Sequence, residues 1–366
     1  MITGMLHQII IISTFNNTTL GDRAISFQQL NEIPLPDEIR SEIPLSDKLA
    51  QIKNERDQLI QDIFERRSDK FMLIIGPCSA DNEDAVCEYI SRLAALQDKV
   101  KDRIVLIPRI YTNKPRTTGT GYKGMMHQPD PQKKPNIAAG IKAIRKMHIR
   151  ALSETGLTAA DEMLYPGNAP FLEDLLSYIA VGARSVENQQ HRLTASGFDV
   201  PVGMKNPTSG DLPVMFNAIY AAQHSHIFVH NRWEVETTGN PYTHAILRGS
   251  VDPYGNCISN YHYEDLMRTA SNYKERGLEN PVIVVDTNHA NSNKQFLQQP
   301  RIAMEVMQSR SNDSLLKDYI RGFMIESYLE EGTQKIDENI YGKSITDPCL
   351  GWKDTEKFVL NLAEVV

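Results

Sequence analysis

The chain has 366 residues, of which 41% are hydrophobic and 23% are charged, as is usual for a soluble globular protein. Its net charge of -7 argues against nucleic-acid or anionic-membrane partners, so an anion site must be a local cationic pocket. Its four cysteines have no disulfide-type spacing, and its N-terminal apolar run is too short to span a membrane. These features predict a cytoplasmic protein.

The first part of the chain differs in composition from the rest. Residues 1–45 are polar and rich in turn residues, which is typical of an arm outside the core. Ser46 and Asp47 can cap a helix over residues 48–66. We therefore predict an N-terminal arm and helix over residues 1–66, followed by one domain over residues 67–366.

From Phe71 onward, short apolar runs that end in polar residues alternate with helical patterns. The eight runs are residues 71–79, 104–109, 157–163, 178–185, 200–206, 244–249, 282–290 and 322–327. Helices are predicted between most of them, at residues 138–155, 170–176, 212–223, 263–276 and 299–310. This alternation predicts an α/β fold in which parallel strands close into a (β/α)8 TIM barrel. A doubly wound open sheet is the alternative, but the first run ends in GPCSADN, which is not the GxGxxG of a dinucleotide fold.

One segment interrupts the alternation of strands and helices. Residues 227–238 read IFVHNRWEVETT, in which apolar and charged residues alternate from Trp233 to Glu236. Such alternation is typical of a half-exposed antiparallel hairpin. We predict an inserted β-hairpin at about residues 225–240, before the sixth strand of the barrel.

Nearly every apolar run ends in a side chain that can bind a ligand or react. These side chains are Cys78, Arg109, Glu162, Arg184, Lys205, Arg248, His289 and Glu326. In a barrel the carboxyl ends of all strands face one mouth, where the active site lies. A single arginine after an apolar run is commonplace, but a series at equivalent places predicts one shared site.

The cations of this series continue into the loop after the second run, among threonines and glycines that suit oxyanion binding. Together they are Arg109, Lys114, Arg116, Lys123, Arg184, Lys205 and Arg248. Seven positive charges at one mouth repel each other unless a ligand neutralises them, and a phosphate brings roughly -1.5 to -2. Two phosphates and a carboxylate come close to balance. The alternative is that each cation pairs with an Asp or Glu of the protein instead of a ligand. This explanation is reasonable for any single cation, but it is poor for all seven together.

A second set combines a thiol, an imidazole and two carboxylates. Its members are Cys78, His289, Glu326 and Asp347. Mixed sulfur, nitrogen and oxygen donors suit one divalent transition ion, such as Mn, Fe, Co or Zn, rather than Mg or Ca. Taken singly, a cysteine is more often a buried small hydrophobe and a histidine a surface residue.

With these residues in place, the chain resembles a class I 3-deoxy-D-arabino-heptulosonate 7-phosphate (DAHP) synthase from about Pro34 to its last residue. Long strings in the order of the family carry the resemblance. They are GPCS (76–79), KPRTT (114–118), GARS with VE (182–187), PVGMKN (201–206), ILRG (246–249), DTNHANSNKQ (286–295), ESYLEEG (326–332) and YGKSITDPCLGW (341–352).

The resemblance implies a metal-dependent condensation of phosphoenolpyruvate with erythrose 4-phosphate, the first step of the shikimate pathway to chorismate and the aromatic amino acids. It implies four metal ligands, namely Cys78, His289, Glu326 and Asp347. The residues implied for phosphoenolpyruvate are Arg109, Lys123, Arg184, Lys205 and Arg248, with Glu162 nearby. Those implied for erythrose 4-phosphate are Lys114, Pro115, Arg116 and Thr117, and Asp347 is also expected to bind substrate. Lys114, Glu162 and Lys205, together with Cys78 and His289, are the expected catalytic residues.

The resemblance also implies a homodimer or homotetramer and an aromatic amino-acid effector, with residues 1–66 in a regulatory or oligomerisation role. The loop before PVGMKN carries Phe198 and Asp199 where the phenylalanine-regulated type has Leu and Ser, so the effector stays open. One alternative is an octulosonate 8-phosphate synthase-like enzyme, which the KPRTT string and the hairpin disfavour. Another is a non-catalytic, metabolite-sensing barrel, which the loss of a metal ligand would favour.

Overall fold

The structure is a computed structural model that describes residues 27–366. Residues Pro34–Val366 form one compact unit, and residues 27–33 contain no helix or strand. Most of the arm predicted over residues 1–45 therefore lies outside the described residues, in residues 1–26.

Eight parallel strands form the central sheet, in the order β2-β1-β12-β11-β8-β5-β4-β3. The strands are β1 (Phe71–Gly76), β2 (Ile104–Pro108), β3 (Ala159–Glu162), β4 (Leu176–Val181), β5 (Val202–Lys205), β8 (His244–Leu247), β11 (Ile283–Asp286) and β12 (Ile320–Glu326). A bridge between Arg109 and Ala160 joins β2 to β3, where the N–H of Ile110 donates to the carbonyl of Ala160 at 2.9 Å. Each predicted run overlaps one of these strands, and the predicted (β/α)8 barrel is confirmed.

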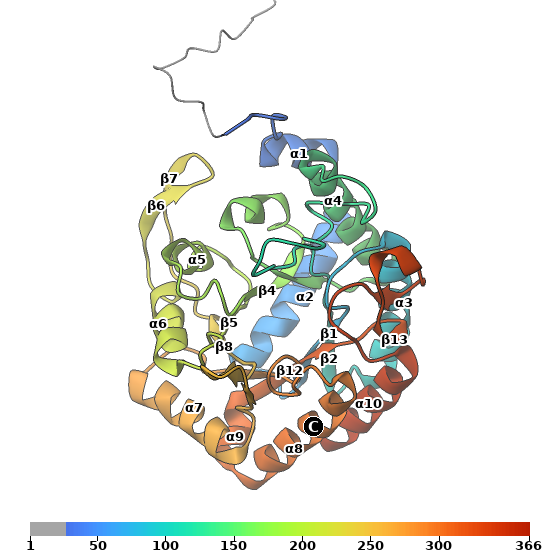
Figure 1. Ribbon diagram of the computed structural model, residues 1–366. Helices are drawn as coiled ribbons and strands as arrows, with labels where there is room; N and C mark the ends of the chain where they lie inside the picture. The colour runs from blue at the N-terminus through green and yellow to red at the C-terminus, as the bar shows by residue number, and fades with distance from the viewer. Residues whose placement is uncertain (1–26) are drawn as a thin grey trace, which may run out of the picture. The chain divides into compact units, whose positions relative to one another are not determined.

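Helices surround the strands (Figure 1). They are α3 (Glu83–Val100), α4 (Ile137–Thr155), α5 (Gln189–Ala195), α6 (Leu212–Ala222), α7 (Tyr263–Arg276), α8 (Gln299–Asn312), α9 (Ser314–Tyr319) and α10 (Trp352–Val365). Four of the five helices predicted between strands are present, but the one at residues 170–176 is wrong. There the chain forms a short 3-10 helix, η1 (Pro166–Phe171), and then enters β4. Proline lacks an N–H and fits only the start of an α-helix, so Pro166 and Pro170 favour this shorter turn.

The core has two layers that follow from the alternation of side chains along each strand. Along β1, Met72 and Ile74 belong to the apolar cluster inside the barrel, whereas Leu73 and Ile75 belong to the cluster between strands and helices. The helix α2 (Asp47–Phe64) contributes to the inner cluster through its last turn, where the ring of Phe64 lies 4.9 Å from the ring of His244. Because His244 begins β8, this contact places the end of α2 at the amino-terminal end of the barrel.

Short elements complete the compact unit. They are α1 (Pro36–Glu42), the pair β6 (Ile227–His230) and β7 (Trp233–Glu236), the pair β9 (Ser250–Val251) and β10 (Cys257–Ile258), the pair β13 (Glu330–Thr333) and β14 (Lys343–Ser344), and the 3-10 turns η2 (Phe296–Gln298) and η3 (Ile336–Glu338). β6 and β7 pair in antiparallel register just before β8, and the side chain of Trp233 is exposed. None of the helices in residues 27–366 combines the length and the apolar character needed to cross a membrane.

Candidate active site

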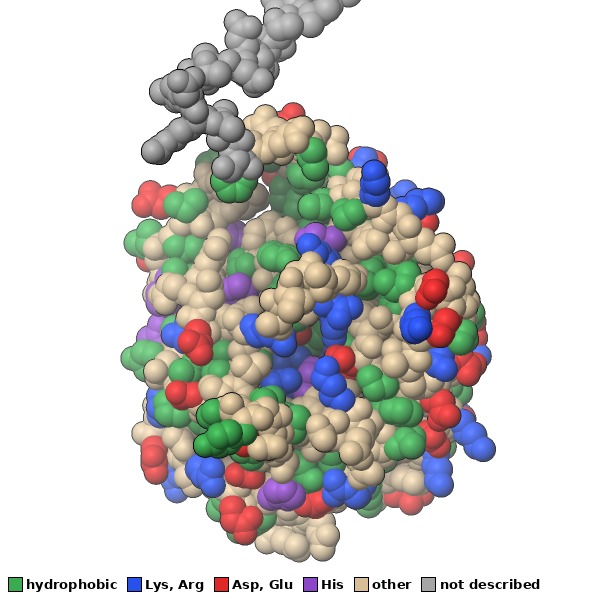
Figure 2. Space-filling view, in the orientation of Figure 1, with side chains coloured by type: hydrophobic (Ala, Val, Ile, Leu, Met, Phe, Trp, Pro, Cys, Tyr) green, Lys and Arg blue, Asp and Glu red, His purple; other side chains and the backbone are tan. Residues whose placement is uncertain are grey.

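A cavity of about 300 Å³ lies among the loops that follow the barrel strands. Lys and Arg side chains gather near the middle of this face (Figure 2). The predicted site residues that line the cavity are Cys78, Arg109, Lys114, Pro115, Arg116, Thr117, Glu162, Arg184, Lys205, Arg248, His289 and Asp347. Two predicted residues do not line it: Lys123 is exposed on the loop after β2, and Glu326 is buried at the end of β12.

The ends of β1 and β2 approach each other closely at the base of this cavity. A Cβ atom on Gly76 would lie 2.5 Å from the carbonyl oxygen of Arg109, so only glycine fits at this position. The Nε of Arg109 then donates to the carbonyl of Pro77 at 3.1 Å. The close approach therefore places Cys78, two residues after Gly76, beside the cationic end of β2.

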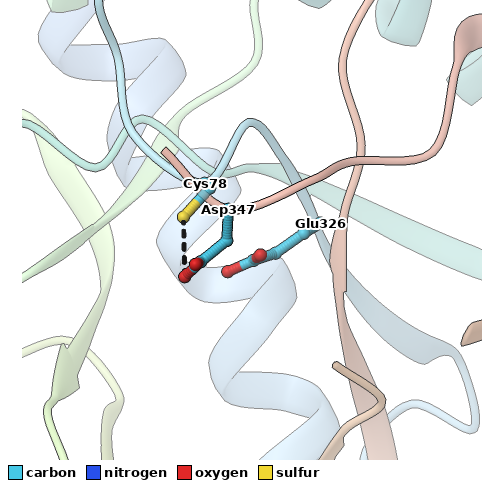
Figure 3. Close-up of side chains that lie close together, drawn as sticks. All are labelled: Cys78, Glu326 and Asp347. Carbon is cyan, nitrogen blue, oxygen red and sulfur yellow. Dashed lines mark hydrogen bonds between the residues drawn. The ribbon is translucent and has the colours of Figure 1, made fainter. Parts of the chain in front are cut away.

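Three of the four predicted metal ligands meet at one point. The ligand atoms of Cys78, Glu326 and Asp347 lie within 4.8 Å of one another, and Sγ of Cys78 lies 3.6 Å from Oδ2 of Asp347 (Figure 3). They come from the loop after β1, the end of β12 and the loop after β14. His289 is adjacent, with Nε2 3.8 Å from Oε1 of Glu326.

These four residues fit a divalent transition ion. A thiol, an imidazole and two carboxylates supply the mixed donor atoms that such ions prefer. Asp286 adds a feature of metal-binding histidines, because its Oδ2 lies 2.9 Å from Nδ1 of His289, on the ring side away from Glu326. An outer carboxylate of this kind orients a ligating imidazole. His289 also has a φ of 52°, in the left-handed region that few non-glycine residues adopt.

Two lysines flank the proposed ligand Asp347. Nζ of Lys114 lies 2.7 Å from Sγ of Cys78 and 2.9 Å from Oδ2 of Asp347, while Nζ of Lys294 lies 2.8 Å from Oδ1. Burial acts to raise the pKa of Asp347, but Lys114 and Lys294 outweigh it and hold that pKa well below its usual range. Burial, together with Glu326, raises the pKa of the Cys78 thiol.

Arg109 and Glu326 form a buried ion pair, with Nη2 2.8 Å from Oε1 and side chains only 2% and 1% exposed. The other nitrogen, Nη1 of Arg109, is buried and has no hydrogen-bond partner among the described residues, and the same holds for Nη1 of Arg248. Buried polar atoms are nearly always paired, so two unpaired guanidinium nitrogens from residues that line one cavity point to an anionic ligand.

Glu162 and Lys205 face each other inside the same cavity, with Nζ of Lys205 3.4 Å from Oε2 of Glu162. Burial acts to raise the pKa of Glu162, but Lys205 and Arg109 outweigh it, and the pKa is lowered. A Cβ atom on Gly182 would lie 2.6 Å from Oε1 of Glu162, so this glycine leaves room for the carboxylate. Glu162 is therefore a carboxylate that can accept a proton beside a cation.

The structure adds lining or supporting residues that the sequence did not reveal as site residues. They are Tyr111, Asn113, Ser185, Asp286 and Lys294. Asp286 could have been found from its place, since it is the last residue of β11 and stands three positions before His289. Tyr111 and Lys294 carry no such signal, because an aromatic residue or a lysine in a loop is commonplace.

A family model decides what kind of barrel this is. The model of the DAHP synthetase I family matches residues 47–359, which include all of the barrel and every string on which the resemblance rests. The chain belongs to the DAHP synthetase I family.

Curated relatives within the DAHP synthetase I family extend over almost the whole chain. The "Phospho-2-dehydro-3-deoxyheptonate aldolase, Trp-sensitive" of Escherichia coli (strain K12) is 36% identical over 346 residues, which are 92% of this chain and 96% of the relative. The Phe-sensitive protein of the same strain is 35% identical over 350 residues, 93% of this chain and 97% of the relative. The solved structure of the phospho-2-dehydro-3-deoxyheptonate aldolase from Francisella tularensis SCHU S4 has a TM-score of 0.85 and 30% sequence identity. It covers 93% of this chain and 98% of that chain. The resemblance drawn from the sequence strings is confirmed.

Proposed function

We propose that the chain is a 3-deoxy-7-phosphoheptulonate synthase, which condenses phosphoenolpyruvate, erythrose 4-phosphate and water to DAHP and phosphate. Membership of the DAHP synthetase I family supports this reaction. The single structural observation that carries it is the pair of buried, unpaired guanidinium nitrogens of Arg109 and Arg248 beside a cavity rich in cations. Such a cavity requires polyanionic substrates.

The cations divide between the two substrates. Phosphoenolpyruvate is held by Arg109, Arg184, Lys205 and Arg248, which follow four different barrel strands and line one cavity. Lys123 stays a predicted fifth contact, since its exposed side chain does not line the cavity.

The loop after β2 forms the proposed binding site for erythrose 4-phosphate. Its residues are Lys114, Pro115, Arg116 and Thr117, with Asp347 across from Lys114. The guanidinium of Arg116 is held by its own loop, because Nε donates to the carbonyl of Tyr122 at 2.8 Å. This leaves the terminal nitrogens of Arg116 for the phosphate of the aldose.

The four-residue set Cys78, His289, Glu326 and Asp347 holds the divalent ion, whose identity among Mn, Fe, Co and Zn the donor atoms do not separate. When bound, the ion supplies a Lewis acid for the aldehyde oxygen. Lys114 is held protonated, because Cys78 and Asp347 outweigh the effect of burial and raise its pKa. Its Nζ can therefore give a proton to the alkoxide that forms when carbon three of phosphoenolpyruvate attacks the aldehyde.

The second half of the reaction belongs to Glu162 and Lys205. Water adds to the cationic carbon two, and the carboxylate of Glu162 takes a proton from that water. The carbon-two hydroxyl group then becomes the ketone as the bond between carbon two and the bridging oxygen breaks, and its proton leaves with the phosphate. The proton on Glu162 returns through solvent to Lys114. Lys205, 3.4 Å from Glu162, keeps that carboxylate ionised until the water arrives and helps to neutralise the leaving phosphate.

We also propose how the protein is regulated and assembled. Residues 1–66 serve regulation and oligomerisation and residues 67–366 catalysis, in a cytoplasmic homodimer or homotetramer. An aromatic amino acid is the effector, as the names of the Trp-sensitive and Phe-sensitive relatives suggest. Phe198 lines a small, mostly apolar cavity with Leu172, Leu176 and Ile179, which suits part of an aromatic ligand.

Product analysis tests the proposed reaction against its two alternatives. The full chain is incubated with phosphoenolpyruvate and either erythrose 4-phosphate or arabinose 5-phosphate, and the products are identified by mass spectrometry. We expect a seven-carbon phosphate product with the first aldose and little product with the second. An eight-carbon product would favour the octulosonate 8-phosphate synthase-like enzyme, and no product with either would favour the metabolite-sensing barrel.

A further inference from the structure

Tyr111 lies where the barrel interior meets the cavity. Its side chain belongs to the apolar cluster inside the barrel, together with Ala160, Tyr178 and Met324, and it also lines the cavity. The residue is only 2% exposed. The ring of Tyr111 therefore forms part of the floor of the cavity.

Two of the proposed phosphoenolpyruvate ligands lie against this one ring. Cζ of Arg109 lies 3.8 Å from the ring centroid of Tyr111, and Nζ of Lys205 lies 5.6 Å from the same centroid. Arg109 follows β2 and Lys205 ends β5, so the ring connects two separate parts of the barrel rim. Arg109 and Tyr111 are two positions apart in an extended segment, which places both side chains on the same side of the chain.

The ring is well suited to hold these cations without using their hydrogen bonds. Both side chains are almost fully buried, at 2% and 3% exposed, and burial of a charge is costly unless it is compensated. The face of an aromatic ring is negative and attracts a cation within about 6 Å, most strongly where water is excluded. The contact leaves Nη1 of Arg109, which has no partner among the described residues, free for an anion.

We propose that Tyr111 is a positioning residue that holds Arg109 and Lys205 at a fixed separation through its ring face, and thereby sets the affinity for phosphoenolpyruvate. The identity of this anion rests on the proposed function. The hydroxyl group contributes little, because within residues 27–366 it donates only to Sδ of Met324 at 3.5 Å, and a thioether is a weak acceptor. The ring of Tyr111, rather than its hydroxyl group, therefore positions the two cations.

Two variants separate the ring from the hydroxyl group. Tyr111→Phe keeps the ring, and Tyr111→Leu replaces it with an apolar side chain that has no negative face. For each purified full-length variant, the dissociation constant of phosphoenolpyruvate is measured by calorimetry, and KM is measured for both substrates. We expect wild-type values for Tyr111→Phe. For Tyr111→Leu we expect the dissociation constant and KM of phosphoenolpyruvate to rise about tenfold or more, since buried cation–π contacts reach ~2 kcal/mol.

The effect on the other substrate distinguishes positioning from general distortion. We expect KM for erythrose 4-phosphate to change by about twofold or less in Tyr111→Leu, because the two cations against the ring, Arg109 and Lys205, are proposed ligands of phosphoenolpyruvate. Equal dissociation constants in Tyr111→Leu and Tyr111→Phe, or an equal rise of KM for both substrates, would overturn the inference. If wild-type protein did not bind phosphoenolpyruvate at all, the proposed function would fail and the inference with it.

Phenylalanines with one, two or three ring fluorines at position 111 provide a test that does not depend on the folding of the leucine variant. Fluorine withdraws negative charge from the ring face while the shape of the side chain changes little. The logarithm of the phosphoenolpyruvate dissociation constant should rise with the number of fluorines. A constant value across this series would contradict the inference, whatever the behaviour of Tyr111→Leu.

Discussion

Nζ of Lys114 lies 2.7 Å from Sγ of Cys78 and 2.9 Å from Oδ2 of Asp347. One segment, residues 104–124, thus carries Arg109, a proposed phosphoenolpyruvate ligand, and Lys114, which lies beside two proposed metal ligands. Because β2 and its loop hold both groups, we propose that their spacing sets the gap across which the new carbon–carbon bond forms. Control of this spacing by a single loop is the feature that most closely connects the fold to the reaction.

Replacement of Lys114 by methionine should remove the proton donor while it leaves all four proposed metal ligands in place. We expect kcat to fall by about 10²- to 10⁴-fold, the range typical of a lost general acid. Metal content, measured by atomic emission, should remain that of the wild type. Activity within about tenfold of the wild type would show that Lys114 is not the proton donor.

The buried pair of Arg109 and Glu326 predicts a change in stability as well as in binding. Arg109→Leu leaves the carboxylate of Glu326 buried without its partner, which should lower the free energy of unfolding by about 3–5 kcal/mol. Arg184→Leu is the matched control, because Arg184 lines the same cavity but is exposed. It should weaken phosphoenolpyruvate binding and change stability by about 0.5 kcal/mol or less. Denaturant unfolding measures the stability of both variants, and an Arg109→Leu variant as stable as the wild type would contradict the account.

The buried imidazole of His244 predicts a loss of stability in acid. Burial lowers the pKa of His244 to about 4, although Nδ1 contacts the carbonyl of Tyr242 at 2.9 Å and Nε2 contacts the hydroxyl of Tyr178 at 2.7 Å. Since the unfolded chain binds this proton with a pKa of about 6.5, it takes up more protons than the folded chain between those two values. The free energy of unfolding should therefore fall by on the order of 3 kcal/mol as the pH drops from about 6.5 to about 4.

Denaturant unfolding of His244→Gln at pH 7 and pH 4.5 tests this prediction. The variant should lose much of the difference between the two pH values. His224→Gln removes an exposed histidine and should leave the difference unchanged. Equal pH dependence in the wild type and His244→Gln would show that another group governs acid stability.

Metal removal should abolish activity reversibly. After chelation, Mn, Fe, Co or Zn should restore turnover, whereas Mg and Ca should not, because a thiolate and an imidazole favour transition ions. Cys78→Ala should bind no metal with high affinity and should show no turnover. Cys87→Ala is the control, since Cys87 is a buried thiol of α3 that is not among the proposed ligands. Full turnover of Cys78→Ala would remove Cys78 from the metal site.

The sequence predicted the barrel well, because strand ends in such a fold are marked by both composition and chemistry. Apolar runs such as residues 282–290 end in reactive side chains, and closure of the barrel brings those ends together. The helix predicted at residues 170–176 failed because Pro166 and Pro170 favour a 3-10 turn over an α-helix. The helix α3 was not singled out, although its Asn82 cap and its apolar face are regular.

Within the site, the sequence found the groups proposed to contact a substrate or the metal ion, and it missed groups that position them. Asp286 acts through His289, and Tyr111 acts through Arg109 and Lys205, so neither is marked by its own chemistry. Lys123 is the opposite case. Its charge predicted a contact with phosphoenolpyruvate, but its exposed side chain does not line the cavity. The sequence shows which residues can react, but the distances between their reactive groups depend on how β2 and the neighbouring strands and loops pack together.

Phosphate release by the purified full-length chain tests the central claim most directly. It is measured with phosphoenolpyruvate alone, with erythrose 4-phosphate alone and with both, in metal-loaded protein. The account predicts rapid release only when both substrates are present, at one phosphate per DAHP formed. Release from phosphoenolpyruvate alone, or no release with both, would contradict it.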